Sequence, residues 1–344
     1  MTVALTDHYG LQGQGGLALA ATDRDLREAA QHNVEVGYWL LSGGPEPLFD
    51  KIAQHRAIRA LAPDMAFDAV VVQDATDLPS RPPSTTVIRP ALSPSSRGCA
   101  AMAGPDLPLS TEDRARFSTQ GGPFLVHEYV AGTPFFVNGV MSGGFLTVSD
   151  IWECGLWQVD CRPILVSVIN ATLANLPVGT RDALETLARG LGILAGPVHF
   201  EIIRTDAGSV KLVKFAPRLA SSPLPELCTL AGMPTQEARL GQAQRGNFDK
   251  HLPGGPPPRR HVADYSFSFS RSGRLRSIRA NCAQSLDSVC VVFHAVPAGT
   301  DVRATHDGLS YGLTLFLANA SRGALRADIA QLQRFQSEGV FDYD

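Results

Sequence analysis

Residues 198–218 read VHFEIIRTDAGSVKLVKFAPR and carry the strongest indication of the fold. Apolar and polar side chains alternate over residues 198–204 and again over residues 210–215, which is typical of β-strands. Asp206-Ala207-Gly208 lies between the two runs and is a common hairpin-turn sequence. The sequence therefore predicts two antiparallel strands joined by a short turn, with charged side chains on both strands.

Further helices and strands are predicted on both sides of this hairpin. Amphipathic periodicity predicts helices over residues 23–33, 50–61, 180–194 and 323–335, and a fifth helix that begins near residue 110. Runs of β-branched and aromatic residues predict strands over residues 67–73, 84–88, 124–130, 135–141, 145–152, 263–269 and 289–295. Proline-rich residues 254–260 predict a linker. This mixture indicates the α+β class, with antiparallel sheets and flanking helices.

Composition and charge exclude several classes of protein. The chain has 344 residues, of which 44% are hydrophobic and 18% are charged, and its net charge is −3. These values predict a globular protein with one large or two medium cores, and neither nucleic acid nor a membrane as a partner. The first residues lack a basic segment followed by an apolar one, and the six cysteines include no C-x-x-C pair. We therefore expect a cytoplasmic location with reduced thiols.

Three further segments, in their order along the chain, resemble those of a known family. Asp50-Lys51 opens a helix. Val87-Ile88-Arg89-Pro90 is followed by the small-residue loop Ser95-Ser96-Arg97-Gly98, and Leu125-Val126-His127-Glu128-Tyr129-Val130 comes next. Together with the hairpin, these segments resemble the ATP-grasp superfamily, in its branch of carboxylate–amine (L-amino acid) ligases.

The resemblance implies an ATP-grasp fold, in which two α+β subdomains surround a cleft and a C-terminal α+β lobe follows. It divides the chain into a remnant N-terminal segment (1–48), a small subdomain (49–122), a central or large subdomain (123–250) and the C-terminal lobe (251–344). In that family the cleft holds ATP, acidic side chains hold metal ions on its phosphates, and an amine attacks an acyl phosphate. Fold alone does not fix activity, so each position has to be compared with the family's pattern.

The metal-binding strands depart from that pattern. Glu201 matches the family's first acid, but Lys214 stands at the position of the second Glu, and Ala216 at that of an Asn. Magnesium requires oxygen ligands, and a like charge about 4 Å away costs about 4 kcal/mol per charge pair at an intermediate dielectric. The family's N-terminal domain is also shortened, to 48 residues in this chain. In addition, Arg89 stands in place of a Lys of the family, and His127 and Pro134 each stand in place of a Glu. We therefore predict no metal and no cofactor, with ATP and Mg²⁺ as the alternative.

Two groups of side chains are predicted to form the site in the cleft. The predicted catalytic residues are Glu201, His199, Lys214 and Arg218. We expect the charges of these side chains to form a network that takes the place of the metal. The predicted substrate-binding residues are Arg89, His127, Asp150 and Glu153. Structural roles stay open for several of them: Glu201 and Lys214 as an ion pair, His199 as a core histidine, and His127 as a partner of a neighbouring strand.

The combination of a family-like cleft and altered metal positions predicts an enzyme that works without ATP. We expect acid–base chemistry, such as dehydration, Michael-type addition or cyclisation, on a polyketide or peptide-like small molecule in bacterial specialised-metabolite biosynthesis. One alternative is an ATP-dependent carboxylate–amine ligase, and another is a non-catalytic pseudoenzyme that binds a small molecule. A homodimer is compatible with each of these functions.

Overall fold

The computed structural model describes residues 2–3, 16–20, 25–41, 44–92, 101–159, 162–244, 258–279, 286–305 and 310–344. The predicted loop Ser95–Gly98 and the predicted linker up to residue 257 lie outside these ranges. In the described part the α-helices are α1 (Leu26–Glu35), α2 (Lys51–Leu61), α3 (Thr111–Gln120), α4 (Thr180–Gly190), α5 (Leu224–Ala231), α6 (Gln236–Gln244) and α7 (Arg322–Glu338). None of the described helices is long and apolar enough to cross a membrane.

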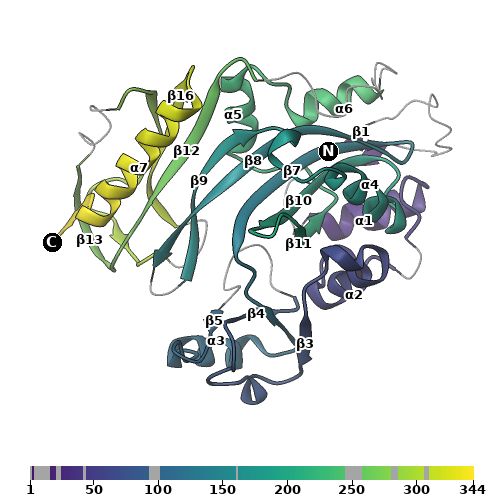
Figure 1. The fold of residues 1–344 in the computed structure, drawn as a ribbon, viewed down its shortest axis with the longest axis horizontal. Helices are drawn as coiled ribbons and strands as arrows, with labels where there is room; N and C mark the ends of the chain where they lie inside the picture. Colours follow the sequence, from purple (N-terminus) through teal and green to yellow (C-terminus); the bar gives the residue numbers. More distant parts are fainter. Residues whose placement is uncertain are drawn as a thin grey trace.

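An eight-stranded antiparallel sheet forms the centre of the molecule (Figure 1). Its order is β11-β10-β7-β8-β9-β12-β16-β14. The strands are β7 (Gly132–Ser142), β8 (Phe145–Val159), β9 (Arg162–Ala171), β10 (Gly196–Thr205), β11 (Val210–Ala216), β12 (His261–Ser268), β14 (Val289–Ala295) and β16 (Tyr311–Asn319). The pairing of β12 with β9 makes this sheet continuous across the predicted boundary at residue 250. The sequence did not predict β9 and β16 as strands.

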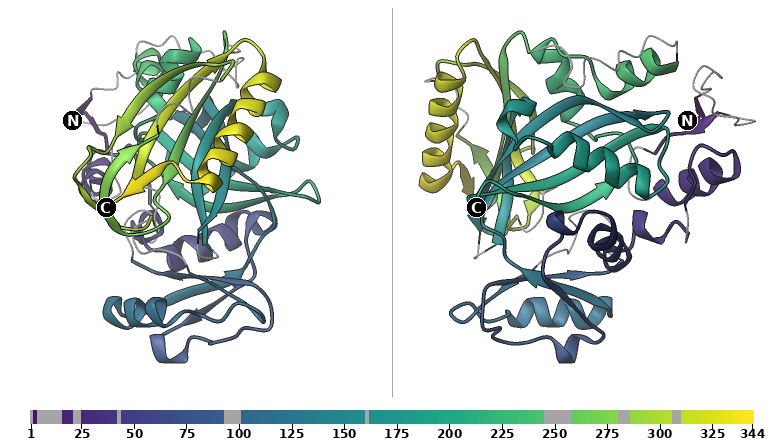
Figure 2. Two further views of the ribbon diagram at one scale, coloured as in Figure 1. Left: turned by 90° about the vertical axis from the view of Figure 1, so that its left-hand side faces the viewer. Right: turned by 45° about the vertical axis from the view of Figure 1, so that its right-hand side comes forward.

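A smaller four-stranded sheet lies below the large one in both views of Figure 2. Its order is β3-β6-β4-β5, from β3 (Ala69–Val72), β6 (Phe124–Glu128), β4 (Thr86–Pro90) and β5 (Ala101–Ala103). β6 pairs with both β3 and β4, so the predicted boundary at residues 122/123 falls before the last strand of this sheet. Short strands pair elsewhere: β1 (Thr2–Val3) with β2 (Leu17–Ala18), and β13 (Gly273–Ile278) with β15 (Asp301–Val302) and β17 (Phe341–Tyr343).

The predicted hairpin is confirmed as β10 and β11, with Glu201 directly opposite Lys214 in the register. Gly208 in the turn has a φ of 81°, a left-handed conformation that glycine adopts without steric cost. Alternate residues of a strand point to opposite faces of its sheet. His199 and Glu201 therefore share one face with Lys214, whereas Phe200 and Ile202 belong to the buried core on the opposite face.

Each face of the large sheet has its own cover. Apolar residues of α1, α2 and α4 form one core with residues of β7, β8, β10 and β11 on one face, and α7 packs on the same face against β12 and β16. The opposite face carries Trp152, Val168 and Phe316, which pack against α5. α5 covers only part of this face, and the uncovered part faces a large cavity. The fold thus leaves the side of the sheet that carries Glu201 and Lys214 accessible.

Gln54 of α2 connects the helix to the edge strand β11 through two buried hydrogen bonds and forms a third with the segment that precedes the helix. Its amide nitrogen donates to the carbonyl oxygens of Pro47 and Phe215, and its amide oxygen accepts from the Phe215 backbone nitrogen at 3.1 Å. Asp50 caps the helix by accepting from the backbone nitrogens of Ile52 and Ala53. These contacts hold the strand that carries Lys214 against α2.

We expect Gln54→Ala to lower the free energy of unfolding by about 2–3 kcal/mol, because it leaves buried backbone groups without hydrogen bonds. Urea denaturation of the variant measures this loss. Arg56→Ala, at an exposed position of the same helix, is the matched control, with an expected change within about 0.5 kcal/mol. Equal effects of the two substitutions would show that the Gln54 contacts do not stabilise the edge strand.

Candidate functional site

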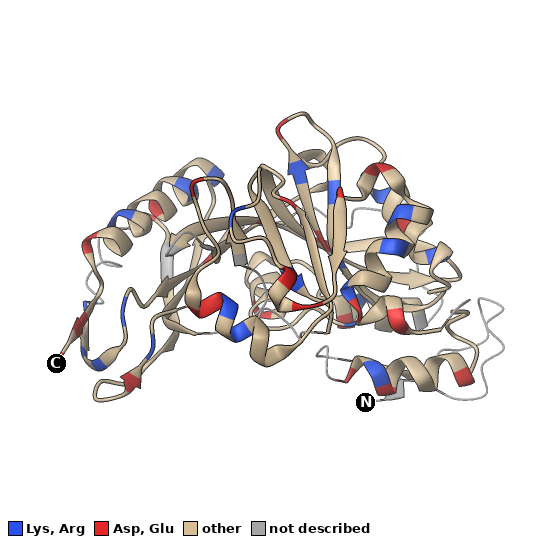
Figure 3. Cartoon of the chain, turned by 90° about the horizontal axis from the view of Figure 1, so that it is seen from below, with Lys and Arg blue, Asp and Glu red and all other residues tan. Residues whose placement is uncertain are grey.

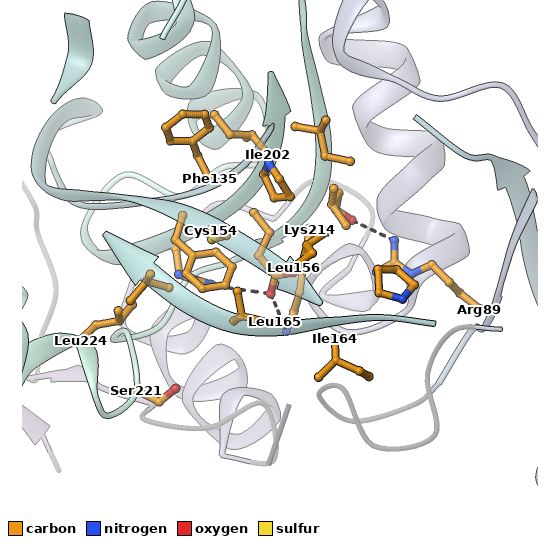
Figure 4. Close-up of a pocket in the computed structure, with 18 of the residues that line it drawn as sticks. Arg89, Phe135, Cys154, Leu156, Ile164, Leu165, Ile202, Lys214, Ser221 and Leu224 are labelled. Atoms are coloured by element: carbon orange, nitrogen blue, oxygen red, sulfur yellow. Dashed lines mark hydrogen bonds and ion pairs between the residues drawn. The ribbon is translucent and has the colours of Figure 1, made fainter. Parts of the chain in front are cut away.

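A cavity of about 1080 Å³ lies on the uncovered face of the large sheet, next to the strands of the small sheet. This volume is at the upper end of the range for small-molecule sites, about 300–1,000 Å³. Figure 4 shows part of its lining, in which Leu156, Ile164 and Leu165 contribute apolar side chains near Lys214. The cavity is therefore large and largely apolar, with charged groups gathered in one part of it.

Glu201 is at the centre of the charged part. Its carboxylate oxygen Oε1 lies 3.8 Å from Lys214 Nζ and 3.6 Å from His199 Nε2. Burial opposes ionisation of Glu201, but the Lys214 charge and the adjacent His199 outweigh it and lower the pKa of the carboxyl to about 2. The Glu201 side chain is 30% exposed, and this exposed part faces the cavity that it lines. Glu201 is therefore an anion at neutral pH.

His199 is fixed by a row of polar residues that crosses three strands. His199, Asn138 and Asp150 lie opposite one another on β10, β7 and β8. The Asn138 amide nitrogen donates to the Asp150 carboxylate, so the Asn138 oxygen accepts, and it lies 2.7 Å from His199 Nδ1. His199 Nδ1 must therefore carry a hydrogen, which leaves Nε2 directed at Glu201 and the cavity.

The protonation state of His199 follows from its surroundings. Burial is the main cause that lowers the pKa of His199, and the positive charges of Arg218 and Lys214 act in the same direction. Glu201 raises the pKa but does not reverse the shift. His199 is thus neutral at pH 7, and its Nε2 lone pair is exposed to the cavity beside a carboxylate. Such an imidazole is suited to accept a proton.

Two arginines add positive charge to this part of the cavity. Arg89 on β4 is buried, lines the cavity and donates to the Val213 carbonyl oxygen at 3.1 Å. Arg218 follows β11, also lines the cavity, and donates to the Leu219 carbonyl oxygen at 2.9 Å. Lys214 and Arg89 act on the Glu201 carboxylate, and Lys214 and Arg218 act on His199, so three cations lie in this part of the cavity. The excess of positive charge favours an anionic group or a developing oxyanion there.

His127 lines the cavity from the small sheet. Its ring stacks on Phe67 at 4.6 Å between centroids, and its Nδ1 lies 2.8 Å from the Glu128 carbonyl oxygen. Because a carbonyl accepts, Nδ1 is the donor and carries a hydrogen. Burial and the charge of Arg89 lower the pKa of His127 to about 3. His127 therefore stays neutral and forms part of the cavity wall.

Asp150 and Glu153 do not line the cavity, in contrast to the predicted substrate-binding role. Asp150 is 5% exposed and accepts hydrogen bonds from Asn138, Ser149 and Trp152, so it lies behind His199 rather than beside a ligand. Glu153 is on the other face of β8 and forms ion pairs with Arg322 at 3.1 Å and Arg326 at 2.5 Å. Asp150 and Glu153 lie on opposite faces of β8 because side chains alternate between the two faces along a strand and the two residues are an odd number of positions apart.

The sequence did not single out Asn138 and Asp264, which the structure brings to the site. Asp264 on β12 is buried, lines the cavity and accepts from the Val168 backbone nitrogen at 2.7 Å. Burial raises the pKa of its carboxyl to about 7. The alternation of Ala263, Asp264, Tyr265 and Ser266 signalled a polar strand face, but not that this face lines a cavity.

The residues at the metal position do not fit a magnesium ion. In the described ranges, no three His, Cys, Asp or Glu side chains converge on a point where they could hold a metal. Lys214 Nζ lies 3.8 Å from Glu201, and an ammonium group has no lone pair to offer. Octahedral coordination by oxygen ligands therefore lacks both a second protein carboxylate and a favourable charge.

Comparisons with known proteins identify the fold. No protein-family model and no curated protein matches the sequence. An L-amino acid ligase from Bacillus licheniformis has a similar structure, with a TM-score of 0.68 and 16% identity over 94% of this chain and 79% of that chain. A phosphoribosylglycinamide synthetase from Anaerococcus prevotii gives a TM-score of 0.55 and 11% identity over 94% of this chain and 82% of that chain. The predicted ATP-grasp fold is confirmed.

Proposed function

We propose that this protein is an enzyme that uses the ATP-grasp fold for acid–base chemistry without a divalent metal. The single observation that carries the proposal is the 3.8 Å approach of Lys214 Nζ to Glu201 Oε1. The ammonium group neutralises the carboxylate in the way that a metal ion does in the family that the sequence resembles. The adjoining neutral His199 then supplies a proton acceptor at the same position.

The proposed reaction assigns a separate role to each side chain. His199 Nε2 removes a proton from a carbon next to a carbonyl group, and Lys214 and Arg218 stabilise the negative charge that develops on the carbonyl oxygen. Glu201 stabilises the imidazolium that results. A carboxyl group with a pKa of about 2 is a weak base, so His199 rather than Glu201 takes the proton.

Two overall reactions balance with this set of groups. In a dehydration, the carbon–oxygen bond at the β-carbon breaks and the imidazolium returns its proton to the leaving hydroxyl, which departs as water. In a Michael-type ring closure, His199 takes a proton from a substrate hydroxyl, the oxygen attacks the β-carbon of an α,β-unsaturated carbonyl group, and the imidazolium returns the proton to the α-carbon. Neither reaction consumes a nucleotide. The volume and apolar lining of the cavity support a bulky substrate of polyketide or peptide-like character.

Turnover in the presence of EDTA and in the absence of nucleotide tests this proposal. We expect the loss of one water, or an isomerisation without change of mass, when the substrate is followed by mass spectrometry. Strict dependence on both ATP and Mg²⁺, with formation of ADP, would contradict it.

Thermal unfolding provides a test that needs no substrate. We expect the melting temperature of the wild type to be unchanged by millimolar Mg²⁺, because Lys214 occupies the metal position. Lys214→Glu combined with Ala216→Asn adds the two oxygen ligands of the family's pattern and is expected to produce a Mg²⁺-dependent increase. Lys214→Met is the matched control, since it removes the charge without adding a ligand. Stabilisation of the wild type by Mg²⁺ that disappears in Glu201→Gln would contradict the proposal.

A second candidate function is ATP-dependent carboxylate–amine ligation. It is supported by the structural similarity to two proteins that are named as a ligase and a synthetase. These are the L-amino acid ligase from Bacillus licheniformis and the phosphoribosylglycinamide synthetase from Anaerococcus prevotii. Lys51 and Arg89 also line the cavity, where cations suit phosphate groups. ADP release that requires a carboxylate and an amine would establish ligation and exclude the nucleotide-free reaction.

A further inference from the structure

The cavity has a second polar region at Asp264, on the strands of the C-terminal lobe. Asp264 and Ser266 of β12 line the cavity together with Thr314 of β16, and the hydroxyl oxygens of Ser266 and Thr314 lie 2.9 Å apart. Asp264 Oδ1 accepts from the Val168 backbone nitrogen, and the backbone nitrogen of Asp264 also donates to the carboxyl group. The carboxyl therefore belongs to a built polar site rather than to an ion pair.

The sheet register places this region far from Glu201. Asp264 lies opposite Val168 of β9, and Val168 lies opposite Cys154 of β8. Glu201 is on β10, so four strand spacings separate it from β12. At about 4.8 Å per spacing this is about 19 Å along the curved surface of the sheet. Glu201 and Asp264 therefore lie in different parts of the cavity.

The surface between the two polar regions is apolar. Cys154 and Val168 lie on the sheet between them, and Leu156 and Leu165 line the same stretch of the cavity (Figure 4). Burial, together with the negative charges of Glu201 and Asp264, raises the pKa of the Cys154 thiol well above its usual value. The thiol is thus neutral and counts as part of the apolar wall. This arrangement fits an extended ligand with an apolar middle section.

The two polar regions differ in charge. Lys214, Arg89 and Arg218 give the Glu201 region an excess of positive charge, as described above. Asp264 has no cation among the causes that shift its pKa, which burial raises. The other titratable groups that line the cavity from neighbouring strands are Cys154 of β8, Tyr311 of β16 and His294 of β14. The Tyr311 hydroxyl donates to the Leu165 carbonyl oxygen.

We propose that the cavity binds an elongated amphiphilic chain, with its anionic or enolisable carbonyl end between Lys214 and Arg218 and a hydroxyl group donating to Asp264. This inference names the substrate class for the proposed function and rests on it. The spacing of the two polar regions sets the length of the chain, and the apolar wall excludes charge from its middle. A polyhydroxylated or highly charged ligand, such as a nucleotide, lacks these features.

The binding of two probes tests the inference without turnover. Palmitate carries the anionic end and the apolar chain, and ω-hydroxypalmitate adds a terminal hydroxyl. We expect isothermal titration calorimetry at pH 8 to show about tenfold tighter binding of ω-hydroxypalmitate, since a hydrogen bond to a charged group is worth about that factor. Below pH 6, where Asp264 is protonated, we expect this preference to shrink. Equal affinities for both probes at pH 8 would overturn the inference.

Two variants distinguish the contribution of Asp264 to binding from the contributions of the other polar groups in the cavity. Asp264→Asn keeps an oxygen that accepts from the Val168 nitrogen, so we expect it to fold, and we expect its preference for ω-hydroxypalmitate to be small and independent of pH. A preference that still changes with pH in this variant would assign the effect to a different group and overturn the role of Asp264. Lys214→Met is expected to weaken the binding of palmitate and of ω-hydroxypalmitate by the same factor. Failure of the nucleotide-free reaction leaves these binding results unaffected, so the two proposals are refuted by different measurements.

Discussion

His199→Gln is expected to lower kcat by about 10²–10⁴-fold, the usual contribution of a positioned general acid–base group. Gln has no nitrogen that accepts and returns a proton near neutral pH. The polar row through Asn138 and Asp150 fixes the ring so that Nε2 faces the cavity. The loss should appear in kcat, because a proton transfer occurs only in the transition state. Steady-state kinetics of the variant measure it.

The dependence of the activity on pH is an independent test of the role of His199 as a base. A base must be unprotonated, and burial lowers the pKa of His199 below its ordinary value of 6.5. Activity should therefore be constant through neutral pH and fall only on the acid side, below that ordinary value. The acid limb should disappear in His199→Gln, whose residual activity has no such group.

A matched histidine outside the cavity serves as the control. His261 begins β12 and does not line the cavity, so His261→Gln is expected to retain kcat. An unchanged kcat with a raised KM in His199→Gln would show that His199 only binds substrate. Absence of turnover by the wild type, together with binding of a small molecule that His199→Gln weakens, would favour the non-catalytic pseudoenzyme.

Asp150→Ala is expected to have the largest effect on stability, a loss of about 4 kcal/mol in the free energy of unfolding. The Asp150 carboxylate accepts from the Asn138 amide, the Ser149 hydroxyl and the Trp152 indole nitrogen. Each buried donor left without an acceptor costs about 1–3 kcal/mol. Trp152 is fully buried beneath α5, so water does not readily replace the lost carboxylate. Urea denaturation measures the change.

Asp150→Asn is the graded control for this substitution. It keeps one acceptor oxygen but adds donors, so an intermediate loss is expected. The Asn138 amide also loses its fixed orientation in Asp150→Ala, and the acid limb of the pH profile should therefore shift with the loss of stability. A change below about 1 kcal/mol would show that the polar row is hydrated or rearranged.

The sequence predicted the part of the site that lies within one hairpin. Alternation and the turn at Gly208 placed Glu201 and Lys214 on two paired strands, and the register confirms that they are opposite each other. Local patterns suffice there because turn geometry and the period of two fix which side chains meet. The order of short motifs similarly predicted the ATP-grasp fold, which the solved structures confirm.

Charge on the surface carried little further information. Figure 3 shows that the positions of Lys and Arg are interspersed with those of Asp and Glu along the described part of the chain. Such a distribution does not indicate a particular ligand. The informative charges are the few that lie inside the cavity.

The sequence by itself determined the α+β class, the hairpin, and the replacement of a metal-binding acid by Lys214. Only the tertiary structure decided that Asp150 supports His199 through Asn138, that Glu153 pairs with α7, and that Asp264 lines the same cavity as Glu201. The physical reason is the distance between these residues along the chain. Contacts such as that between Val168 and Asp264, which are 96 residues apart, depend on strand order and on which face a helix covers, and local periodicity specifies neither.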